Sequence, residues 1–197
     1  MVFILASGSA SRRQILTNAA VPFTAQAADV DEESLKIRLL AKGTAVRDVA
    51  VHLAEAKALA VSNLRPEALV LGADQTLVID EQLVSKCADR AAARALLLRL
   101  RGRTHQLAGG MVLARRGNVL WRHVETSTLT MRAFSEAFLD VYLAAEGEAL
   151  LASVGCYRME GLGAQLFAAV EGDYFAILGL PLQPLLAELR NQGVLQT

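Results

Sequence analysis

The chain has 197 residues, no formal net charge and 53% hydrophobic residues, which favours one domain with a sizeable core. Its 20 basic and 20 acidic residues argue against a nucleic-acid polymer as partner, because such binding needs a basic surplus. No uncharged apolar run reaches the roughly 18 residues of a membrane span, and no basic leader precedes the first apolar run, so neither a membrane segment nor a signal peptide is expected. Cys87 and Cys156 lack zinc-ligand spacing and suggest no disulfide framework, which favours a reducing, cytoplasmic setting.

The start of the chain predicts a strand, a tight turn and a helix. Val2–Ala6 is apolar, Ser7-Gly8-Ser9 follows, and Ser11–Ala20 has helical spacing. Backbone N–H groups and the helix dipole favour an anion at such a turn. Arg12 and Arg13 add planar guanidinium groups suited to phosphate oxygens. The first 13 residues therefore predict a site for a phosphate-bearing substrate.

The later elements predict an α/β protein with a mixed sheet. Strands and helices alternate early, and a strand pair stands in the middle of the chain. The predicted elements are strand Phe23–Val30, an acidic turn at residues 31–33, helix Asp48–Asn63 with Asp48 as N-cap, strand Ala68–Ala73, helix Asp89–Leu100, strands Gln106–Ala114 and Val119–Met131, helix Ser135–Ala145, apolar runs Ala164–Val170 and Phe175–Leu178, and helix Pro184–Asn191.

Asp74 is the strongest candidate for catalysis. The apolar strand Ala68–Ala73 runs directly into this carboxylate, and ligands of open α/β sheets gather beyond the carboxyl ends of strands. Asp74 is thus placed where an acid, a base or a metal ligand is expected. The alternative is that Asp74 caps the following turn.

Three further charged residues have a structural and a functional interpretation. Lys57 lies among alanines and Lys86 follows an apolar run, so each is either a surface residue with a buried stem or a phosphate ligand. Glu32, in the acidic turn, either is solvated or helps to hold a divalent cation beside a triphosphate. His105 precedes a strand and allows both a structural and a functional role. The chain contains no serine-hydrolase elbow, Walker loop or dinucleotide-binding fingerprint.

These segments together resemble the Maf family, the septum-formation-type nucleoside triphosphate pyrophosphatases. The resemblance runs nearly end to end. It rests on Leu5-Ala6-Ser7-x-Ser9-x-x-Arg12-Arg13, Asp31-Glu32, Leu53-Ala54-x-x-Lys57-Ala58, Gly72-Ala73-Asp74, Gly102-Arg103-Thr104-His105, Gly172-Asp173-Tyr174 and Gly179-Leu180-Pro181-Leu182, in that order.

The chain departs from the family pattern at three places. Ala10 and Ser11 stand where the opening motif usually has proline before its arginines, and Cys87 rather than proline follows Lys86. Gln75 and Glu160 replace the Thr and Gln of the branch that prefers thymidine and uridine triphosphates. An Asp-Gln pair with a later Glu-Gly is similar to the branch that acts on 7-methyl-GTP.

The resemblance implies a single Maf-like domain over residues 1–197, with a mixed twisted sheet, flanking helices and two lobes around a central cleft. It also implies a divalent cation, Mg²⁺ or Mn²⁺, a house-cleaning role in nucleotide metabolism and, as a common state, a homodimer. The expected partner is a nucleotide, with neither a nucleic-acid polymer nor a membrane.

The expected reaction is hydrolysis of a nucleoside triphosphate to its monophosphate and pyrophosphate. The expected roles are substrate binding for Ser7, Ser9, Arg12, Arg13, Lys57, Gln75, Lys86 and Glu160, general-base catalysis for Asp74, and metal binding for Glu32 and Asp74. Gln75 and Glu160 are expected nearer the nucleoside, where a carboxylate suits a guanine-type base. A nucleotide-sensing regulator of cell division without catalysis is the competing function, and a phosphomonoesterase is a third.

Overall fold

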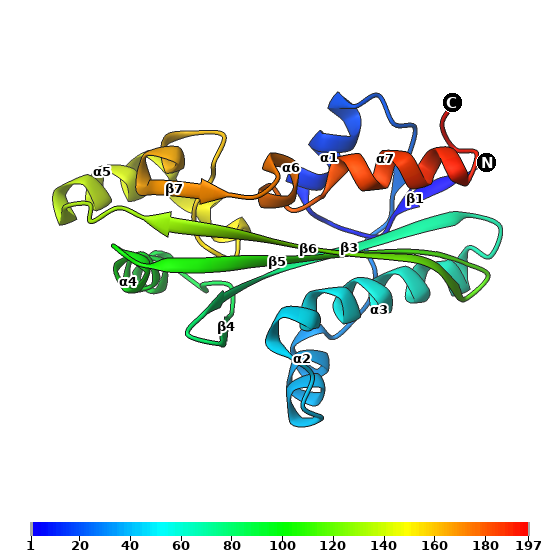
Figure 1. The fold of residues 1–197 in the computed structure, drawn as a ribbon, viewed down its shortest axis with the longest axis horizontal. Helices are drawn as coiled ribbons and strands as arrows, with labels where there is room; N and C mark the ends of the chain where they lie inside the picture. Colours follow the sequence, from blue (N-terminus) through cyan, green and yellow to red (C-terminus); the bar gives the residue numbers. More distant parts are fainter. Residues whose placement is uncertain (1, 197) are drawn as a thin grey trace. The chain divides into compact units, whose positions relative to one another are not determined.

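The computed structural model describes residues 2–196, and these residues build a mixed seven-stranded sheet flanked by helices (Figure 1). The strand order is β2-β1-β3-β5-β6-β7, with β4 paired with β3. The elements are β1 (Phe3–Leu5), α1 (Ala10–Asn18), β2 (Thr24–Ala25), α2 (Glu32–Ala41), α3 (Val49–Leu64), β3 (Leu69–Ile79), β4 (Gln82–Val84), α4 (Arg90–Leu100), β5 (Thr104–Arg115), β6 (Asn118–Met131), α5 (Glu136–Glu146), β7 (Phe167–Glu171), α6 (Tyr174–Ile177) and α7 (Leu182–Asn191), with 3₁₀ turns at Val46–Asp48, Gly147–Ala152 and Leu162–Leu166. The predicted α/β class with a mixed sheet is confirmed.

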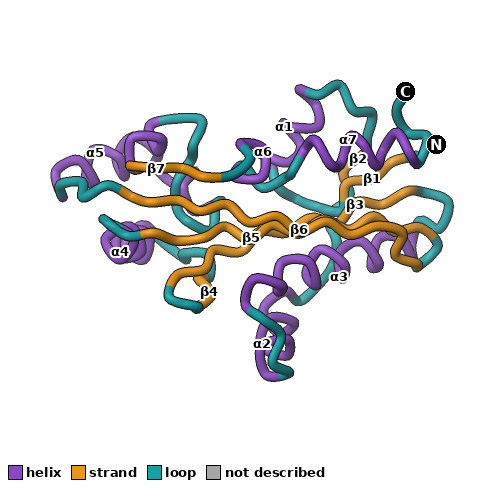
Figure 2. The backbone as a smooth tube through the Cα atoms, in the orientation of Figure 1, coloured by secondary structure: helices purple, strands orange, loops and turns teal. Residues whose placement is uncertain are grey.

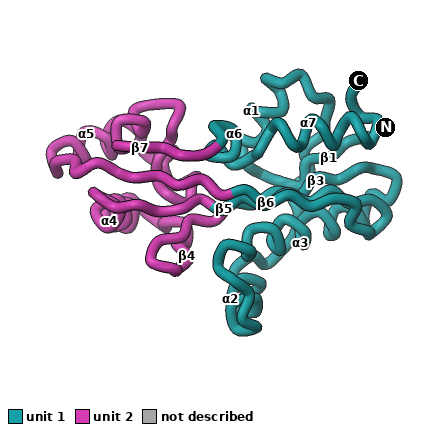
Figure 3. Tube along the Cα trace, viewed as in Figure 1, with its two compact units in different colours: residues 1–75, 108–125, 173–197 teal, residues 76–107, 126–172 magenta. Residues whose placement is uncertain are grey.

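The chain divides into two compact units (Figure 3). Unit 1 holds residues 1–75, 108–125 and 173–197, and unit 2 holds residues 76–107 and 126–172. Strands β3, β5 and β6 each contribute residues to both units. No helix within residues 2–196 is both long and apolar enough to cross a membrane.

In unit 1, helices cover both faces of the strands, with α1 and α7 on one face and α3 on the other (Figure 2). Strand β1 pairs in parallel with β2 and with β3, which places Leu5 opposite Leu71. Successive side chains of a strand point to opposite faces. Accordingly, Leu71 and Ala73 of β3 join a core with α1 and α7, whereas Val70 packs with Val61 of α3. Side chains of neighbouring residues in β3 therefore pack on opposite faces of the sheet.

In unit 2, two helices and their caps bury a second set of apolar side chains. Asp89 caps α4 by accepting a hydrogen bond from the Ala92 N–H, and Ser135 caps α5 in the same way. The two helices are joined by a hydrogen bond from Arg90 to the Leu143 carbonyl oxygen, 3.0 Å long. The predicted helices Asp89–Leu100 and Ser135–Ala145 are confirmed to within a residue at each end.

Three predicted elements differ from the structure. The strand expected over Phe23–Val30 is limited to Thr24–Ala25. The acidic turn at residues 31–33 is the start of α2, where Asp31 is the N-cap and accepts a hydrogen bond from the Ser34 N–H. Strand β3 continues to Ile79 instead of ending at Ala73. Asp48 precedes α3 as expected, but its side chain makes no capping bond.

The burial of His105 predicts that unit 2 loses stability as the pH falls. Its Nε2 lies 2.8 Å from the Tyr157 hydroxyl, and its buried Nδ1 has no hydrogen-bond partner within residues 2–196. Burial lowers the pKa of His105 from 6.5 to about 4. As the pH falls, His105 takes up its proton in the unfolded chain before it does so in the folded protein. The free energy of unfolding therefore decreases between pH 6.5 and pH 4. At about 1.4 kcal/mol per pKa unit, the loss is about 3 kcal/mol.

Denaturant unfolding across this pH range measures the effect. The His105→Gln variant is expected to show a shallower loss of unfolding free energy between pH 6.5 and pH 4 than the wild type. The exposed His52 supplies the control, since His52→Gln is expected to keep the wild-type slope. Parallel curves for wild type and His105→Gln would contradict the prediction.

Candidate active site

The loop after β1 is organised by its own hydroxyl groups. The Ser7 hydroxyl accepts a hydrogen bond from the Ser9 N–H at 3.2 Å, and the Ser9 hydroxyl accepts one from the Arg12 N–H at 3.4 Å. Ser9 is thereby the N-cap of α1. The other N–H groups of the first turn of a helix have no acceptor within the helix, so they are available to an anion. The predicted strand, turn and helix are confirmed.

Arg12 is a buried cation, 8% exposed, and two of its three side-chain nitrogens donate hydrogen bonds. Its Nε donates to the Gly179 carbonyl oxygen at 2.9 Å, and its Nη1 donates to the Ser7 hydroxyl at 3.1 Å. Burial lowers the pKa of Arg12, and the charges of Asp74 and Glu32 act in the opposite direction. Within residues 2–196, no carboxylate lies in ion-pair contact with it. A buried guanidinium without a direct counter-ion favours an anionic ligand.

Asp74 lies within β3 and not at its end, which corrects the expected end of the strand at Ala73 and the alternative that Asp74 caps the following turn. It neither ends the strand nor caps a turn, and its Oδ1 accepts a hydrogen bond from the N–H of Gln75 at 2.8 Å. The neighbouring strand β1 nevertheless ends at Leu5, opposite Leu71. Asp74 therefore stands beyond the carboxyl end of its parallel neighbour, where a ligand can approach it.

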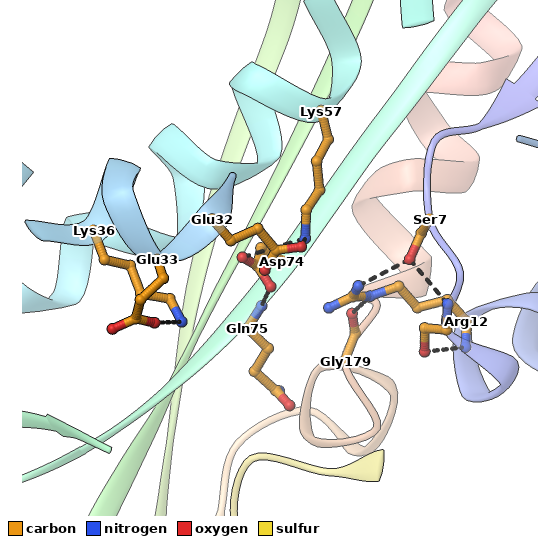
Figure 4. Close-up of polar contacts among 10 residues, drawn as sticks. Ser7, Arg12, Glu32, Glu33, Lys36, Lys57, Asp74, Gln75 and Gly179 are labelled. Carbon is orange, nitrogen blue, oxygen red and sulfur yellow. Dashed lines mark hydrogen bonds and ion pairs between the residues drawn. The ribbon is translucent and has the colours of Figure 1, made fainter. Parts of the chain in front are cut away.

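Lys57 joins two carboxylates in one charged cluster (Figure 4). Its Nζ lies 2.8 Å from Oε1 of Glu32 and 3.5 Å from Oδ2 of Asp74. The Lys57 side chain is 9% exposed, so its interpretation as a surface lysine is wrong. Likewise, Glu32 belongs to the first turn of α2 and bonds to a buried amine, which is not the environment of a solvated turn.

Glycine sets the distance between α3 and the sheet. A Cβ on Gly72 would collide with the Ala54 carbonyl oxygen and lie 2.7 Å from the Ala58 nitrogen. A Cβ on Gly110 of β5 would likewise collide with the backbone of Val51. The helix backbone thus rests directly on the strands. Because Gly72 and Asp74 share a face of β3, this close approach brings Lys57, which lies between Ala54 and Ala58 on α3, within reach of Asp74.

The remaining predicted residues lie in different surroundings. Arg13 is exposed on α1. Gln75 of unit 1 faces α6, and its Nε2 donates to the Ala176 carbonyl oxygen at 2.8 Å. Lys86 and Glu160 are exposed residues of unit 2, in the loops after β4 and before the 3₁₀ turn Leu162–Leu166. His105, also in unit 2, is buried against Tyr157 and Phe167, which supports its structural interpretation.

Gly179 was not singled out as a site residue. It has a φ of +100°, and its carbonyl oxygen is the acceptor for Arg12. The signal that could have found it is the pattern Gly179-Leu180-Pro181-Leu182, because glycine readily adopts the left-handed backbone conformation that a turn between two apolar segments can require.

Glu32 and Asp74 are the residues best placed to hold a divalent cation. Their oxygens already converge on one cationic atom, the Lys57 Nζ. Mg²⁺ is commonly held by one or two carboxylates together with substrate phosphates and water. No group of three or more His, Cys, Asp or Glu side chains in residues 2–196 is arranged to hold a metal. A cation held by these two carboxylates would need further ligands, such as substrate phosphates and water.

The family model for Maf-like proteins matches residues 2–192. The chain belongs to the Maf-like family. The family resemblance inferred from the motifs is thereby confirmed, and the match covers every residue of the cluster around Lys57 and of the loop around Arg12.

Curated relatives within the family match almost the full chain. A nucleoside triphosphate pyrophosphatase of Maricaulis maris is 54% identical over 194 residues, which cover 98% of each chain. A 7-methyl-GTP pyrophosphatase of Mesorhizobium japonicum is 53% identical over 192 residues, covering 98% of this chain and 96% of the relative. A 7-methyl-GTP pyrophosphatase of Brucella abortus is 47% identical over 189 residues, covering 96% of this chain and 95% of the relative.

Proposed function

We propose that this Maf-like protein hydrolyses a nucleoside triphosphate to the nucleoside monophosphate and pyrophosphate. The observation that carries the proposal is the meeting of two features in unit 1. One is the buried Arg12 at the N-terminus of α1, which donates hydrogen bonds to Gly179 and Ser7, and the other is the Lys57 cluster with Glu32 and Asp74. The names of the relatives from Maricaulis maris and Mesorhizobium japonicum support the same reaction.

The charges of the site suit a polyphosphate only with a further cation. Arg12 and Lys57 are balanced by Glu32 and Asp74, which leaves the exposed Arg13 as surplus. A triphosphate carries roughly four negative charges, which its site must neutralise in the transition state. The proposal therefore includes Mg²⁺ or Mn²⁺ held by Glu32 and Asp74. When bound, the cation neutralises phosphate charge and polarises phosphoryl oxygens.

In the proposed mechanism, Asp74 is the general base for the attacking water. Its Oδ1 is held by the Gln75 N–H and its Oδ2 faces Lys57, so the carboxylate has a fixed orientation. Water attacks the α-phosphorus and gives its proton to Asp74. Arg12, Lys57 and the N–H groups of the Ser7–Ser9 loop stabilise the negative charge on the departing pyrophosphate. Substrate binding by Arg13, Lys86 and Glu160 stays a prediction from the sequence pattern.

The proposal also includes which base the substrate carries. Gln75 and Glu160 match the 7-methyl-GTP-type pattern, and two of the relatives carry that name. We therefore propose 7-methyl-GTP as the preferred substrate and a cytoplasmic location, which the two free thiols Cys87 and Cys156 support.

A product assay tests the proposed function. The purified protein is incubated with Mg²⁺ or Mn²⁺ and 7-methyl-GTP, GTP, UTP, dTTP, CTP or ATP, and the products are separated by chromatography. Monophosphate with pyrophosphate is expected, with 7-methyl-GTP turned over fastest. Free phosphate as the first product would indicate a phosphomonoesterase. Tight binding without turnover of any nucleotide would instead support a nucleotide sensor.

Two neighbouring glutamates on α2 test the metal site. Glu32 bonds to Lys57, whereas Glu33 is exposed and pairs with Lys36 at 3.4 Å. Glu32→Gln is expected to raise the Mg²⁺ concentration for half-maximal activity by about tenfold or more, since it removes one anionic ligand. Glu33→Gln, with the same charge change, is expected to leave it unchanged. Equal metal dependence in both variants would contradict the assignment of Glu32.

A further inference from the structure

The two cysteines of the chain lie far apart in the sequence but contact each other in unit 2. The side chains of Cys87 and Cys156 share a hydrogen bond, and both are free thiols. Cys87 lies in the loop between β4 and α4, and Cys156 lies between the 3₁₀ turns Gly147–Ala152 and Leu162–Leu166. Two thiols in contact are the arrangement from which a reversible disulfide forms. The proposed hydrolysis uses neither of them.

Cys156 is the fixed member of the pair. Its N–H donates a hydrogen bond to the Ser153 carbonyl oxygen at 3.3 Å, and its own carbonyl oxygen accepts one from the Tyr142 hydroxyl at 3.0 Å. Its φ of +54° is uncommon for a residue other than glycine. Its side chain is buried. Both the backbone and the sulfur of Cys156 are therefore held in place.

Cys87 is the accessible member of the pair. Its side chain is half-buried, and its neighbours Lys86 and Ala88 are exposed. Residues 85–88 belong to no helix or strand, and α4 begins only after its N-cap Asp89. An oxidant in solution therefore reaches the sulfur of Cys87 before that of Cys156, and the loop that carries Cys87 has the freedom to move.

The chemistry of Cys156 also makes it the second thiol to react. Burial raises the pKa of Cys156 to about 12, and the hydrogen bond with Cys87 and the negative charge of the Cys87 thiolate raise it as well. Because the thiolate is the nucleophile, Cys156 is unreactive as long as Cys87 is reduced. Oxidation of Cys87 removes the charge of its thiolate and so makes Cys156 easier to ionise.

We propose that Cys87 and Cys156 form a redox-active dithiol, a modification site that hydrogen peroxide converts to an intramolecular disulfide. The Cys87 thiol reduces one peroxide molecule and becomes a sulfenic acid, with release of one water. The Cys156 sulfur then attacks the Cys87 sulfur, the S–O bond breaks, and the leaving hydroxide takes the Cys156 proton to give a second water. Dithiol reductants reverse the reaction, so the reduced pair is the ordinary state in a reducing compartment.

The disulfide is expected to change the position of Lys86. A sulfur–sulfur bond of about 2.05 Å is shorter than any hydrogen-bond contact, so the bond draws Cys87 toward the fixed Cys156 and displaces the adjacent Lys86. This consequence rests on the proposed function, in which Lys86 is predicted to bind phosphate. The expected result in the oxidised protein is a rise of about tenfold in KM for each nucleotide, with an equal weakening of inhibition by inorganic pyrophosphate, as for the loss of one charged hydrogen bond.

Peptide mapping by mass spectrometry tests the modification on the wild type. The protein is reduced with dithiothreitol, freed of reductant, and treated with one equivalent of hydrogen peroxide. The expected product is a monomer that has lost two hydrogen atoms and yields one linked peptide pair containing Cys87 and Cys156. Excess dithiothreitol is expected to restore both the original mass and the original KM.

Two matched variants test the order of the steps. Cys156→Ser is expected to accumulate a sulfenic acid at Cys87, which dimedone traps. In Cys87→Ser, trapping at the buried Cys156 is expected to be at least about tenfold slower. Neither variant is expected to show the tenfold rise in KM after peroxide treatment, since neither can form the bond. Thermal unfolding shows whether each has folded, and Cys156→Ala replaces Cys156→Ser if it has not.

Three results would overturn the inference and leave the proposed function intact. Unlinked cysteines in the peroxide-treated wild type would remove the modification site. Equal trapping of both thiols would remove the assigned order. A linked protein with unchanged KM and unchanged pyrophosphate inhibition would remove the displacement of Lys86. If the reduced wild type turns over no nucleotide, the proposed function fails, while the linked peptides would still establish the dithiol.

Discussion

Replacing Asp74 with asparagine is expected to lower kcat by about 10²–10⁴-fold, the usual contribution of a general base. Asparagine keeps the volume of the side chain and can still accept the hydrogen bond from the Gln75 N–H. Lys57 keeps its shorter ion pair with Glu32, so the cluster is not left without a counter-ion. The fold and nucleotide binding are therefore expected to survive. Steady-state kinetics, calorimetric binding of the substrate and thermal unfolding measure the three quantities separately.

The exposed Asp29 provides the matched control for this change. Asp29→Asn removes one carboxylate charge from the same unit and is expected to leave kcat unchanged. Near-wild-type turnover in Asp74→Asn would remove Asp74 from the proposed mechanism. A parallel loss of turnover and of thermal stability would instead make it a structural residue.

Gly72→Ala is expected to destabilise unit 1 by about 3 kcal/mol or more, at the upper end of the cost of overpacking a core. The added Cβ would meet the backbone of α3 at Ala54 and Ala58, and backbone cannot rotate out of the way as a side chain can. Relief requires α3 to move from the sheet, which would carry Lys57 away from Asp74. Denaturant unfolding measures the stability change, and kcat of the folded fraction measures the displacement.

Gly109, the neighbour of Gly110 in β5, supplies the control. A Cβ at this buried position would lie 3.6 Å from the Glu125 carbonyl oxygen, an ordinary contact. Gly109→Ala is therefore expected to change the free energy of unfolding by less than about 1 kcal/mol. Equal unfolding midpoints for Gly72→Ala and Gly109→Ala would show that α3 does not need its close approach to β3.

The sequence indicates Asp74 as a candidate catalytic residue but does not predict the full length of its strand. An apolar run indicates a strand buried on both faces, and the run stops where Asp74, Gln75 and Thr76 interrupt it. The strand nevertheless continues to Ile79, because its backbone pairing with β4 does not depend on apolar side chains. The interruption marks the candidate site itself, where polar residues replace core residues.

Helix α2 and the burial of Lys57 could not be predicted for a related reason. None of the ten residues of α2 is buried, so the helix has no apolar stripe to reveal it, and the sequence predicts only an acidic turn at residues 31–33. Lys57 lies among alanines that pack against glycine, and small residues give only a weak amphipathic pattern. The neighbouring contact between Gln75 and Ala176 joins residues 101 positions apart, which no local pattern reveals.

The central claim is that water attacks the α-phosphorus of a nucleoside triphosphate, and isotope labelling tests it most directly. The protein is incubated in H₂¹⁸O with Mg²⁺ and the nucleotide it turns over fastest, and the products are analysed by mass spectrometry. The account predicts one ¹⁸O atom in the nucleoside monophosphate and none in pyrophosphate. Label in pyrophosphate would mean attack at the β-phosphorus, label in free phosphate would mean attack at the γ-phosphorus, and either result would contradict the account.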